Sequence, residues 1–518
     1  MSRRLPLNTV FLAALALLAL AGCAAQLASP ELDPIAAQAP QAGRRQWEFD
    51  LDGDRRLDCR EIDADGDSVI DRFEFDTDAD GTFDLVTDQL QPTPEPIPSL
   101  ALFVDGVPFA DVDEMWSQGY FREFHRPGAM VSPFPSMTYV SFAEMLGVQP
   151  PPGYEELYYD PERDALAGGV MKHLGADPDS ASTVNETFLA AVGYRQPALY
   201  SGLVYVFPNR TMRKDLRNAL RYCAAPDSIA IVAYIGTSDG IAHKRGKPGT
   251  RALLIEVDRI LRELVLQHRG RLRVLLASDH GNNYIRCRRI DFAGELARFG
   301  FKVREALADS SSVVIPAFGL VGFAAVYVAA ERAPELAAAA VQIPGVDLAI
   351  YGRDGAAHVL GARGRGEARI TRADEPRRFR YEPLETGDPL ELRHLAAELA
   401  VAGQADSAGF IADRTWFDAT LDHTYPDAVR RVYEAAAGNV QHPATVLLSF
   451  DDSTYYGSKM FDALVDLAGT HGNLRRASTL GCVLSSDEPP PAAVRSWDMR
   501  DMFPAVRFTL SEPRGQLP

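Results

Sequence analysis

The stretch SIAIVAYIGTSDGIAHKRG (Ser228–Gly246) decides the fold class of this chain. Its first part, Ser228–Ile235, is a short apolar run typical of a buried strand. Asp239 and His243 follow, four residues apart, just past the predicted strand end. In an open α/β sheet, ligands gather beyond the carboxyl ends of the strands. The pair is therefore either a metal clamp or an ordinary polar loop, and the two side chains alone favour neither.

Three other apolar runs have the same form, and each leads into an acidic residue: ALFVDGV (Ala101–Val107), RLRVLLASDHG (Arg271–Gly281) and PATVLLSFDD (Pro443–Asp452). Their length and β-branched residues are typical of buried strands. Between them lie helical patterns such as Thr250–Arg269 and Pro334–Gln342. This alternation predicts an α/β domain with a largely parallel central sheet flanked by helices.

Further candidate ligands follow the predicted strands. Asp105 follows the first strand, Asp279 and His280 follow the third, and His471 lies in the loop GTHGNLRR near the C-terminal end. An Asp-His dipeptide after a strand is more often structural than catalytic, so each pair alone is a weak signal. The regular recurrence of such residues at strand ends is the stronger one.

A hydroxyl-bearing turn lies between the first two strands. The segment SPFPSMTYVSFAEMLG (Ser132–Gly147) begins with a proline-containing turn and continues as a helical pattern. Ser136 and Thr138 are therefore expected near a helix N-terminus, where anions bind well.

Taken in chain order, these residues resemble the alkaline phosphatase superfamily, and within it the nucleotide pyrophosphatase/phosphodiesterase branch. The resemblance covers residues 101–490, and the sequence PSMT resembles the family's P-T-x-T nucleophile pattern. It implies an alkaline phosphatase-like fold and a metal-dependent phosphodiesterase or phosphatase in which Thr138 attacks phosphorus. It also implies one metal site made of Asp105, Thr138, Asp279 and His280, and a second made of Asp239, His243 and His471.

The implied chemistry requires two divalent cations about 4 Å apart, which can clamp the attacking and leaving oxygens of an in-line displacement. Imidazole and carboxylate ligands suit Zn²⁺, with Mn²⁺ or Fe as alternatives. Coordination would favour the alkoxide of Thr138, which is a weak nucleophile as a free hydroxyl. Water activated at the second site would then release phosphate from a phospho-threonine. The expected substrate is a small phosphorylated molecule.

Several positions leave alternatives open. Ser141 stands where the family pattern has an Asn that helps hold a phosphate oxygen, which argues against nucleotide-type recognition. Ser136 is the alternative nucleophile. The absence of C-x-P-x-R or S-x-P-x-R at this turn disfavours a formylglycine sulfatase. Other functions consistent with the pattern are a phosphomonoesterase, a sulfatase-like hydrolase and a non-catalytic calcium-binding surface protein on the same fold.

Other polar residues near these motifs are expected to have structural roles. His358, His423, Asp451 and Asp452 match no family ligand. Asn282 and Asn283 follow Asp279 and His280 closely and are candidates for orienting the ligands.

An Asp-rich array precedes the α/β domain. Three 13-residue repeats, DLDGDRRLDCREI, DADGDSVIDRFEF and DTDADGTFDLVTD, fill residues 50–88. Asp recurs at repeat positions 1, 3, 5 and 9: Asp50, Asp52, Asp54 and Asp58, then Asp63, Asp65, Asp67 and Asp71, then Asp76, Asp78, Asp80 and Asp84. Alternating carboxylates are ligands that Ca²⁺ prefers.

The array resembles thrombospondin type 3 repeats rather than paired EF-hands. Glu61 and Glu74 occupy position 12, where an EF-hand has its bidentate ligand, but a glycine at position 6 appears only as Gly81. No room exists for flanking helices between the repeats. A calcium-ordered stalk is therefore expected, with a disordered acidic linker as the alternative.

The N-terminus has the features of an export signal. Arg3 and Arg4 precede the apolar run TVFLAALALLALAG, which is short for a membrane span and typical of a secretory signal. The sequence LAGC that ends at Cys23 resembles a bacterial lipobox, which implies lipidation of Cys23 and a lipid anchor. Ala24 follows, so the resemblance favours the outer membrane of a bacterial cell envelope over inner-membrane retention.

Composition limits the partners and the redox chemistry. Lys and Arg number 53 against 71 Asp and Glu, so a nucleic-acid partner is not expected. Residues 46–88 carry 12 of the net 18 negative charges, from 13 Asp and 3 Glu against 4 Arg. The scattered Cys59, Cys223, Cys287 and Cys482 name no disulfide pair. The predicted units are a signal peptide (1–22), a tether (23–45), the repeats (46–88), a Pro-rich linker (89–100) and the catalytic domain (101–518).

Overall fold

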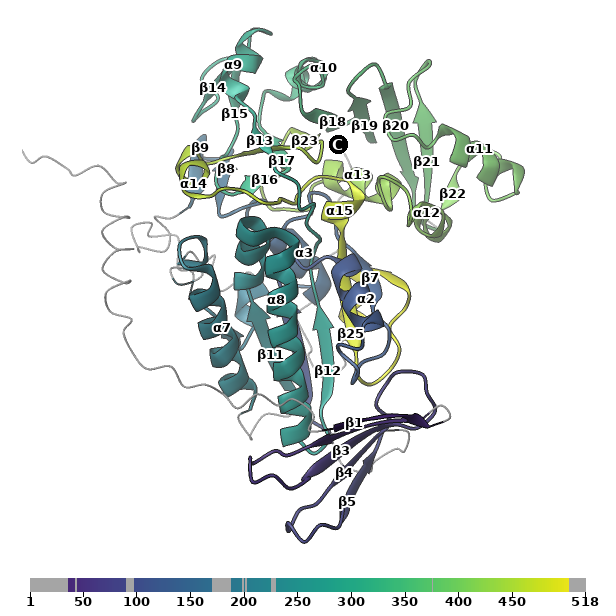
Figure 1. Ribbon diagram of the computed structural model, residues 1–518. Coiled ribbons are helices and arrows are strands. Elements are labelled where there is room, and N and C mark those ends of the chain that lie inside the picture. The colour runs from purple at the N-terminus through teal and green to yellow at the C-terminus, as the bar shows by residue number, and fades with distance from the viewer. Residues whose placement is uncertain are drawn as a thin grey trace, which may run out of the picture.

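The computed structural model describes residues 36–41, 44–89, 97–169, 188–197, 200, 203–224, 230–374 and 376–502 of the 518-residue chain. Three sheet-based parts follow one another along the molecule in Figure 1. A small sheet of the Asp-rich repeats lies at one end, an α/β unit in the middle and a second large sheet at the other end. The signal segment, Cys23 and residues 90–96 of the predicted linker lie outside the described residues.

The middle part contains the predicted α/β sheet. Its strand order is β10-β11-β6-β12-β25-β7-β26. The bounds are β10 Tyr194–Arg195, β11 Ala230–Ile235, β6 Ser99–Val104, β12 Arg273–Ala277, β25 Leu480–Ser485, β7 Gly128–Val131 and β26 Ala493–Arg495. The first four strands are mutually parallel, whereas β25 runs antiparallel to both β12 and β7. The α/β expectation is confirmed.

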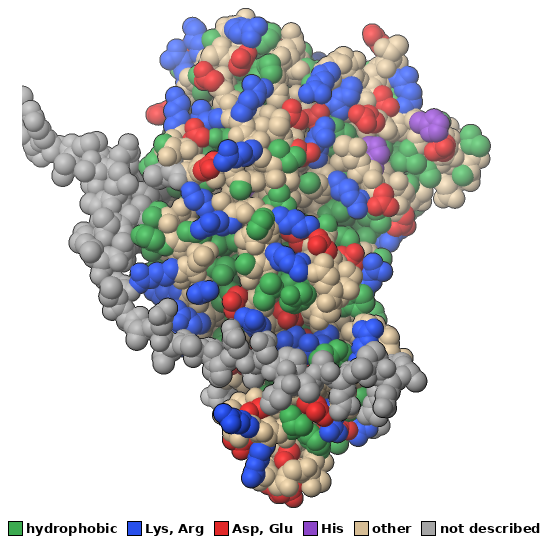
Figure 2. Space-filling model, in the orientation of Figure 1, with side chains coloured by type: hydrophobic (Ala, Val, Ile, Leu, Met, Phe, Trp, Pro, Cys, Tyr) green, Lys and Arg blue, Asp and Glu red, His purple; other side chains and the backbone are tan. Residues whose placement is uncertain are grey.

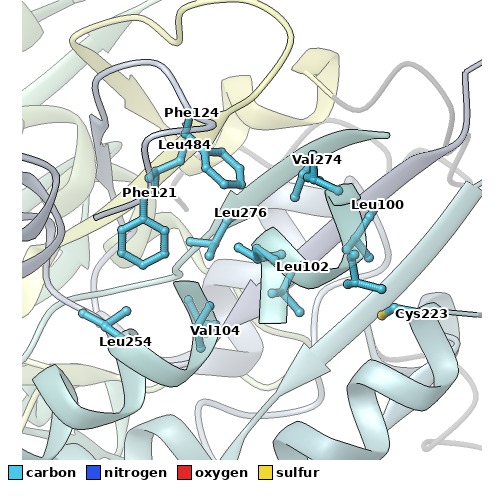
Figure 3. Packing of buried hydrophobic residues seen from close by; sticks show 14 of the residues in the cluster. Leu100, Leu102, Val104, Phe121, Phe124, Cys223, Leu254, Val274, Leu276 and Leu484 are labelled. Atoms are coloured by element: carbon cyan, nitrogen blue, oxygen red, sulfur yellow. The ribbon is translucent and has the colours of Figure 1, made fainter. Parts of the chain in front are cut away.

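Helices cover this sheet and close its core. They are α2 Phe109–Ser117, α3 Thr138–Leu146, α7 Pro208–Cys223 and α8 Thr237–Gln267. In α8 the chain turns out of helical geometry at Gly246, where φ is 59°. Figure 3 shows Leu100, Leu102 and Val104 of β6 packed beside Val274 and Leu276 of β12, all in one buried cluster. Burying such apolar surface is the main source of fold stability.

Residues 320–450 build a second sheet that the sequence pattern did not separate from the first. Its order is β17-β23-β18-β19-β20-β21-β22, with antiparallel pairing throughout. Its strands are β17 Phe323–Val326, β23 Val446–Phe450, β18 Val346–Arg353, β19 Ala356–Gly361, β20 Gly366–Ala373, β21 Arg378–Pro383 and β22 Ile411–Ala412. The expected strand before Asp451 therefore exists, but it belongs to this sheet and not to the parallel one.

Shorter elements complete the fold. The helices are α9 Phe292–Ala297, α10 Ala333–Ala340, α11 Arg393–Val401, α12 Asp413–Thr420, α13 Ala428–Ala437, α14 Lys459–Leu464 and α15 Arg476–Thr479. The remaining strands are β8 Leu157–Asp160, β9 Ala165–Gly168, β13 Arg288–Arg289, β14 Lys302–Arg304, β15 Ser312–Val314, β16 Leu320–Val321 and β24 Thr454–Gly457. The 3₁₀ turns are η1 Phe188–Ala191, η2 Leu203–Tyr205, η3 Ala330–Arg332 and η4 Ser496–Met502.

The Asp-rich repeats form a five-stranded antiparallel sheet in sequence order, β1-β2-β3-β4-β5. The strands are β1 Ala36–Gln41, β2 Arg44–Phe49, β3 Cys59–Asp63, β4 Arg72–Phe75 and β5 Leu85–Asp88. Part of the segment predicted as a tether, residues 23–45, is extended strand, because Ala36–Gln41 pairs antiparallel with Arg44–Phe49.

Each repeat contributes one hairpin loop with the same internal bonds. The Asp at position 9 accepts a hydrogen bond from the backbone amide at position 2: Asp58 from Leu51 at 2.6 Å, Asp71 from Ala64 at 2.7 Å and Asp84 from Thr77 at 2.8 Å. The residue at position 6 has a left-handed φ in all three loops, namely 73° at Arg55, 79° at Ser68 and 91° at Gly81. The loop conformation therefore does not depend on the glycine that only the third repeat has.

The repeat sheet packs onto the α/β unit, so the expected free-standing stalk is wrong. Phe49, Phe73 and Phe75 belong to the same buried cluster as the β6 and β12 side chains. Phe73 lies against Gly270, where an added Cβ would meet the Phe73 ring at 2.5 Å. The alternating Phe and Ile of the repeats point to one face, which gives this sheet an apolar surface that must be covered.

Buried charges also join the two parts. The Arg122 Nε donates to Glu61 Oε2 at 2.8 Å, and the Arg262 Nε of α8 donates to Glu123 Oε1 at 2.9 Å. Glu61 is fully buried, so it does not face the loop as an EF-hand ligand would. Glu74, the other position-12 residue, pairs with Arg60 and Arg72 instead.

We expect Phe73→Ala to destabilise the whole protein and not only the repeats. Phe73 is 1% exposed in the shared core, and loss of such a ring costs about 3–5 kcal/mol. Thermal unfolding followed by circular dichroism should show one transition at a lower temperature. Val86→Ala, which truncates a side chain 46% exposed on the same sheet, is the control. Separate melting of the repeat sheet at an unchanged main transition would contradict the shared core.

The four cysteines in the described part of the chain, Cys59, Cys223, Cys287 and Cys482, are all free thiols. Among the described residues, no helix has both the length and the apolar character needed to cross a bilayer.

Candidate metal centre

The ends of three adjacent parallel strands bring the predicted ligands together. In the order β11-β6-β12, Ile235 pairs with Val104, and Ala277 pairs with Phe103. The chain leaves β6 directly into Asp105 and leaves β12 toward Asp279 and His280. Because parallel strands present their carboxyl ends at the same edge, Asp105 and His280, 175 positions apart in sequence, converge there.

The first group contains Asp105, Asp279 and His280, whose potential ligand atoms all lie within 4.8 Å of one another. The Nε2 of His280 lies 3.5 Å from Asp105 Oδ1 and 3.3 Å from Asp279 Oδ2. Asp279 and His280 are fully buried, and Asp105 is 5% exposed. The backbone amide of Gly106 donates to Asp279 Oδ1 at 3.0 Å and so links the ends of β6 and β12.

The second group contains Asp239, His243 and His471, again within 4.8 Å of one another. The His243 Nε2 lies 3.3 Å from Asp239 Oδ2, and the His471 Nε2 lies 3.6 Å from Asp239 Oδ1. Asp239 and His243 lie in the first turns of α8 rather than in a loop. Their spacing of four residues puts both side chains on one helix face.

The two groups adjoin each other. The rings of His280 and His471 stack with centroids 3.8 Å apart and planes inclined by 11°. Gly106 lies between the groups, because a Cβ there would meet Asp239 Oδ1 at 2.8 Å and His280 Cε1 at 3.2 Å. A larger residue at position 106 would therefore push the two groups apart.

Backbone carbonyls set the orientation of all three imidazoles. The Nδ1 atoms of His243, His280 and His471 lie 2.8, 2.9 and 2.9 Å from the carbonyl oxygens of Gly469, Gly281 and Ser136. A carbonyl only accepts hydrogen bonds, so each Nδ1 carries the proton and each Nε2 presents a lone pair. This is the arrangement that second-sphere partners impose on metal-binding histidines.

Burial shifts the pKa values of several carboxylates and imidazoles in the two groups. Burial and the neighbouring charges of Asp279 and Asp239 raise the pKa of Asp105 well above its usual range, and burial raises the pKa of Asp279 to about 7. Burial lowers the pKa of His280 to about 4, and burial together with the His280 charge lowers the pKa of His471 to about 3. Both imidazoles are therefore neutral near pH 7 and able to bind a cation.

The residues present fit divalent cations. Asp239 Oδ1 and Asp279 Oδ2 are buried and accept no hydrogen bond in the described structure. Buried carboxylate oxygens without partners are costly unless a cation neutralises them. Two carboxylates with one imidazole, and one carboxylate with two imidazoles, are donor sets typical of Zn²⁺ and related metals.

Thr138 lies beside the first group. It is the first residue of α3, and its Oγ1 lies 3.2 Å from Asp105 Oδ1 and 3.5 Å from His280 Nε2. The amides of the first turn of a helix lack partners within the helix, and the helix dipole favours an anion there. Gly147, with φ of 64°, ends this helix after nine residues.

Ser136, the alternative nucleophile, is fully buried and bonded to scaffold atoms. Its Oγ accepts hydrogen bonds from Ser132 Oγ at 2.8 Å and from the Arg431 Nη2 at 3.2 Å. Its carbonyl orients His471, as described above. The role of Ser136 in this geometry is to hold the turn, not to meet a substrate.

Two supporting residues were missed by the sequence reasoning. The Tyr234 hydroxyl, on β11, donates a hydrogen bond to Asp105 Oδ2. A tyrosine within the apolar run SIAIVAYI was a readable signal for such a bond. Arg431, on α13 of the second sheet, donates to Ser136 Oγ and also to the Leu474 carbonyl at 3.1 Å. No local pattern marks Arg431, because its partners are about 300 and 43 residues away.

The residues expected to be structural lie outside both groups. His358 bonds to Glu367 at 2.8 Å on the second sheet, and the His423 Nδ1 accepts from the Tyr425 amide at 3.1 Å. Asn283 orders the site indirectly: its Oδ1 accepts from the Thr470 amide at 2.9 Å, next to His471. Ser141 is fully buried within α3.

No protein-family model matches the chain, and no curated protein matches it. Solved structures of ectonucleotide pyrophosphatase/phosphodiesterase 5 align with it at low identity. The murine protein gives 12% identity and a TM-score of 0.42, with 81% of this chain and 97% of the other covered. The human protein gives 11% identity and a TM-score of 0.43, with 81% of this chain and 96% of the other covered. An inactive murine variant in complex with AMP gives 12% identity and a TM-score of 0.41, with 82% of this chain and 97% of the other covered.

We expect Arg431→Met to lower turnover while leaving the protein folded. Arg431 is 4% exposed, and its guanidinium holds both the turn before Thr138 and the loop after His471. Loss of such an outer partner typically costs about 10–100-fold in metal affinity or activity. Metal titration and turnover of a phosphate ester measure both effects.

Arg430→Met is the matched control, because Arg430 lies on the same helix but pairs with Asp413 at 2.9 Å, away from the site. Arg431→Lys keeps the charge but not the forked geometry, so it should recover only part of the activity. Equal losses in the Arg430 and Arg431 variants would mean that the effect is one of general stability.

Proposed function

We propose that this protein is a metal-dependent phosphoric ester hydrolase that uses Thr138 as its nucleophile. One observation carries the proposal: the Thr138 hydroxyl lies at a helix N-terminus, 3.2 Å from Asp105 Oδ1, beside two adjoining groups of buried carboxylates and imidazoles. A polar loop without a catalytic role would not need three imidazoles whose Nε2 atoms face the carboxylates of two adjoining groups.

Each group has a distinct part in the proposed reaction. Asp105, Asp279 and His280, with Thr138, would hold one divalent cation, and Asp239, His243 and His471 would hold the other. When bound, the cations would supply positive charge that favours the alkoxide and stabilises charge on a phosphate. Thr138 Oγ1 would bond to phosphorus and release its proton to solvent, while the ester P–O bond breaks and the departing alkoxide takes a proton from solvent, so that an alcohol and a phospho-threonine result. Water then attacks this ester and releases phosphate or phosphomonoester together with free Thr138.

The amides of the first turn of α3 would face the phosphate oxygens and hold them by hydrogen bonds and by the helix dipole. Because His280 and His471 would be neutral, they would add no positive charge beside the phosphate. The positive charge at this site would therefore come from the bound cations. The substrate class supported by this arrangement is a small phosphate ester.

The direct test is hydrolysis of p-nitrophenyl phosphate and bis-(p-nitrophenyl) phosphate by the purified full chain. Turnover is expected with Zn²⁺ or Mn²⁺, with loss on chelation and return when metal is restored. The ratio of diester to monoester turnover identifies the subclass. Folded, metal-loaded protein without turnover of either ester, or of a phosphonate or sulfate ester, would overturn the proposal.

We also propose that the repeat loops bind Ca²⁺. Within each loop three carboxylates approach within 4.8 Å: Asp50, Asp52 and Asp58, then Asp63, Asp65 and Asp71, then Asp76, Asp78 and Asp80. Oxygen ligands from a tight loop suit this cation. Calorimetric titration should detect binding that Asp63→Asn and Asp76→Asn weaken. No heat of binding at millimolar Ca²⁺ would exclude it.

For location, we propose an exported protein anchored in a bacterial envelope, as the sequence LAGC before Ala24 implies. Mass spectrometry of the mature protein from a bacterial host should find lipid on Cys23. A Cys23→Ala variant should leave the membrane fraction at high ionic strength, where electrostatic contacts with lipid are screened.

A further inference from the structure

Helix α7 presents a continuous basic stripe to solvent. The helix contains five basic residues at intervals of three and four positions: Arg210, Arg213, Lys214, Arg217 and Arg221. This spacing places all five on one face, and the side chains are exposed. From Arg210 to Arg221 the chain rises by eleven residues at 1.5 Å each, so the stripe is about 17 Å long. Figure 2 shows blue side chains over the part of the molecule where α7 lies in Figure 1.

The stripe is not neutralised by the helix itself. The only acid in α7 is Asp215, which is fully buried and accepts hydrogen bonds from Tyr194 and Thr237 on the opposite face. In the described part of the chain, Arg213, Arg217 and Arg221 pair with no carboxylate, and Lys214 lies over the ring of Tyr200 at 4.1 Å. Four positive charges therefore face solvent on a protein of net charge −18.

Apolar side chains border both ends of the stripe. Val206 and Phe207, 50% and 42% exposed, directly precede the helix, and Tyr222, 39% exposed, lies in its last turn. These three are half of the six large apolar side chains that are exposed in the described structure. Their gathering at one helix is not the scattered pattern of ordinary surface residues.

We propose that the exposed face of α7 docks on an anionic membrane surface. Juxtaposed Lys and Arg attract anionic lipid headgroups, and aromatic side chains settle at headgroup level. The apolar face of α7, with Met212 and Leu216, is buried in the protein core, so the surface that would meet the membrane is the basic stripe with the exposed apolar side chains at its ends. The phosphate backbone of a nucleic acid would bind the basic stripe but would make no favourable contact with Val206 or Phe207. The acidic remainder of the protein would also repel any polyanion that wrapped around it.

Docking through this face has a consequence for orientation. Negative charge elsewhere turns the rest of the molecule away from an anionic bilayer, so α7 sets which side meets it. Val204, two residues before Val206, packs against Gly240, the neighbour of Asp239, since a Cβ at Gly240 would meet the Val204 side chain at 2.1 Å. One end of the docking face therefore adjoins the candidate metal centre. The docking itself does not depend on the proposed hydrolase activity.

The test is sedimentation of the full chain with vesicles of phosphatidylcholine alone or of phosphatidylcholine with phosphatidylglycerol. We expect binding to be markedly stronger with phosphatidylglycerol and to weaken as ionic strength rises, because screening shortens the reach of the charges. Arg213→Glu with Arg217→Glu should reduce binding to the anionic vesicles at least about tenfold. A lipid anchor would bind both vesicle types alike and so cannot mimic this difference.

Lys302→Glu with Arg304→Glu is the matched control. It makes the same change in net charge on exposed residues of β14, at the far end of the molecule from the repeats, and should leave vesicle binding intact. Both double variants are checked for fold by circular dichroism. Equal binding to the two vesicle types, equal losses in the two double variants, or preferential binding of duplex DNA through the same arginines would each overturn the proposal.

Discussion

Thr138→Ala is expected to abolish phosphate-ester turnover without loss of metal. Removing a nucleophile that acts as part of a catalytic unit lowers turnover by about 10⁴-fold or more. The side chain is half-buried at the helix start, and its Oγ1 contacts Asp105 and His280 of the candidate site rather than the core, so the fold should persist. Turnover of p-nitrophenyl esters, with metal content from elemental analysis, measures both quantities.

Two further variants make this result specific. Thr138→Ser keeps a hydroxyl at the same place and should retain measurable turnover. Ser136→Ala removes a hydroxyl that is locked by Ser132 and Arg431, so it should cost far less than Thr138→Ala. Metal-dependent turnover by Thr138→Ala close to that of the unaltered protein would end the proposed mechanism. Loss only in Ser136→Ala would transfer the nucleophile to that residue.

Asp239→Asn is expected to remove one of two metal equivalents and most of the activity. The two oxygens of Asp239 face His243 Nε2 at 3.3 Å and His471 Nε2 at 3.6 Å, so the second group has no other carboxylate. The amide keeps the size of the side chain but not its charge. The loss of activity should exceed the loss of about 10–100-fold that is typical when a residue hydrogen-bonded to a metal ligand is removed. The stoichiometry of Zn²⁺, as distinct from Ca²⁺ in the repeat loops, should fall from two to one, because Asp105, Asp279 and His280 stay intact.

Asp451→Asn is the control, since Asp451 also follows a strand but bonds Ser453 and Thr454 instead of a metal group. It should keep both metal equivalents. A stoichiometry of two in Asp239→Asn, with activity unchanged, would show that the second group is not a metal site.

Local sequence pattern was enough for the elements that hold the site. Buried strands before Asp105, Asp239 and Asp279 follow from apolar runs of the length and composition of strands, and the helix after Thr138 from its periodicity. The pattern failed for the strand Val446–Phe450, which has the same composition as the parallel strands. The amino-acid composition of a strand indicates whether the strand is buried. Because strands of both sheets are buried, composition does not predict to which sheet a strand belongs.

The repeats show the same division. Their 13-residue period predicted three equivalent loops, and in each loop the Asp at position 9 accepts a hydrogen bond from the backbone amide at position 2. It did not reveal that the intervening residues pair as strands and cover the core. Phe73 and Glu61 meet Gly270 and Arg122 only after the chain has folded back over a long distance in sequence.

The sequence by itself predicted the candidate ligands and the strands that most of them follow, since these depend on residue type and on short-range periodicity. Only the tertiary structure decided how they combine. The parallel order β11-β6-β12 brings Asp239, Asp105 and Asp279 to one edge, and carbonyls of remote loops turn the Nε2 atoms of His243 and His471 toward that edge. Sheet order and loop-to-loop hydrogen bonds are long-range contacts, chosen by the packing of the whole core, so no local segment contains them.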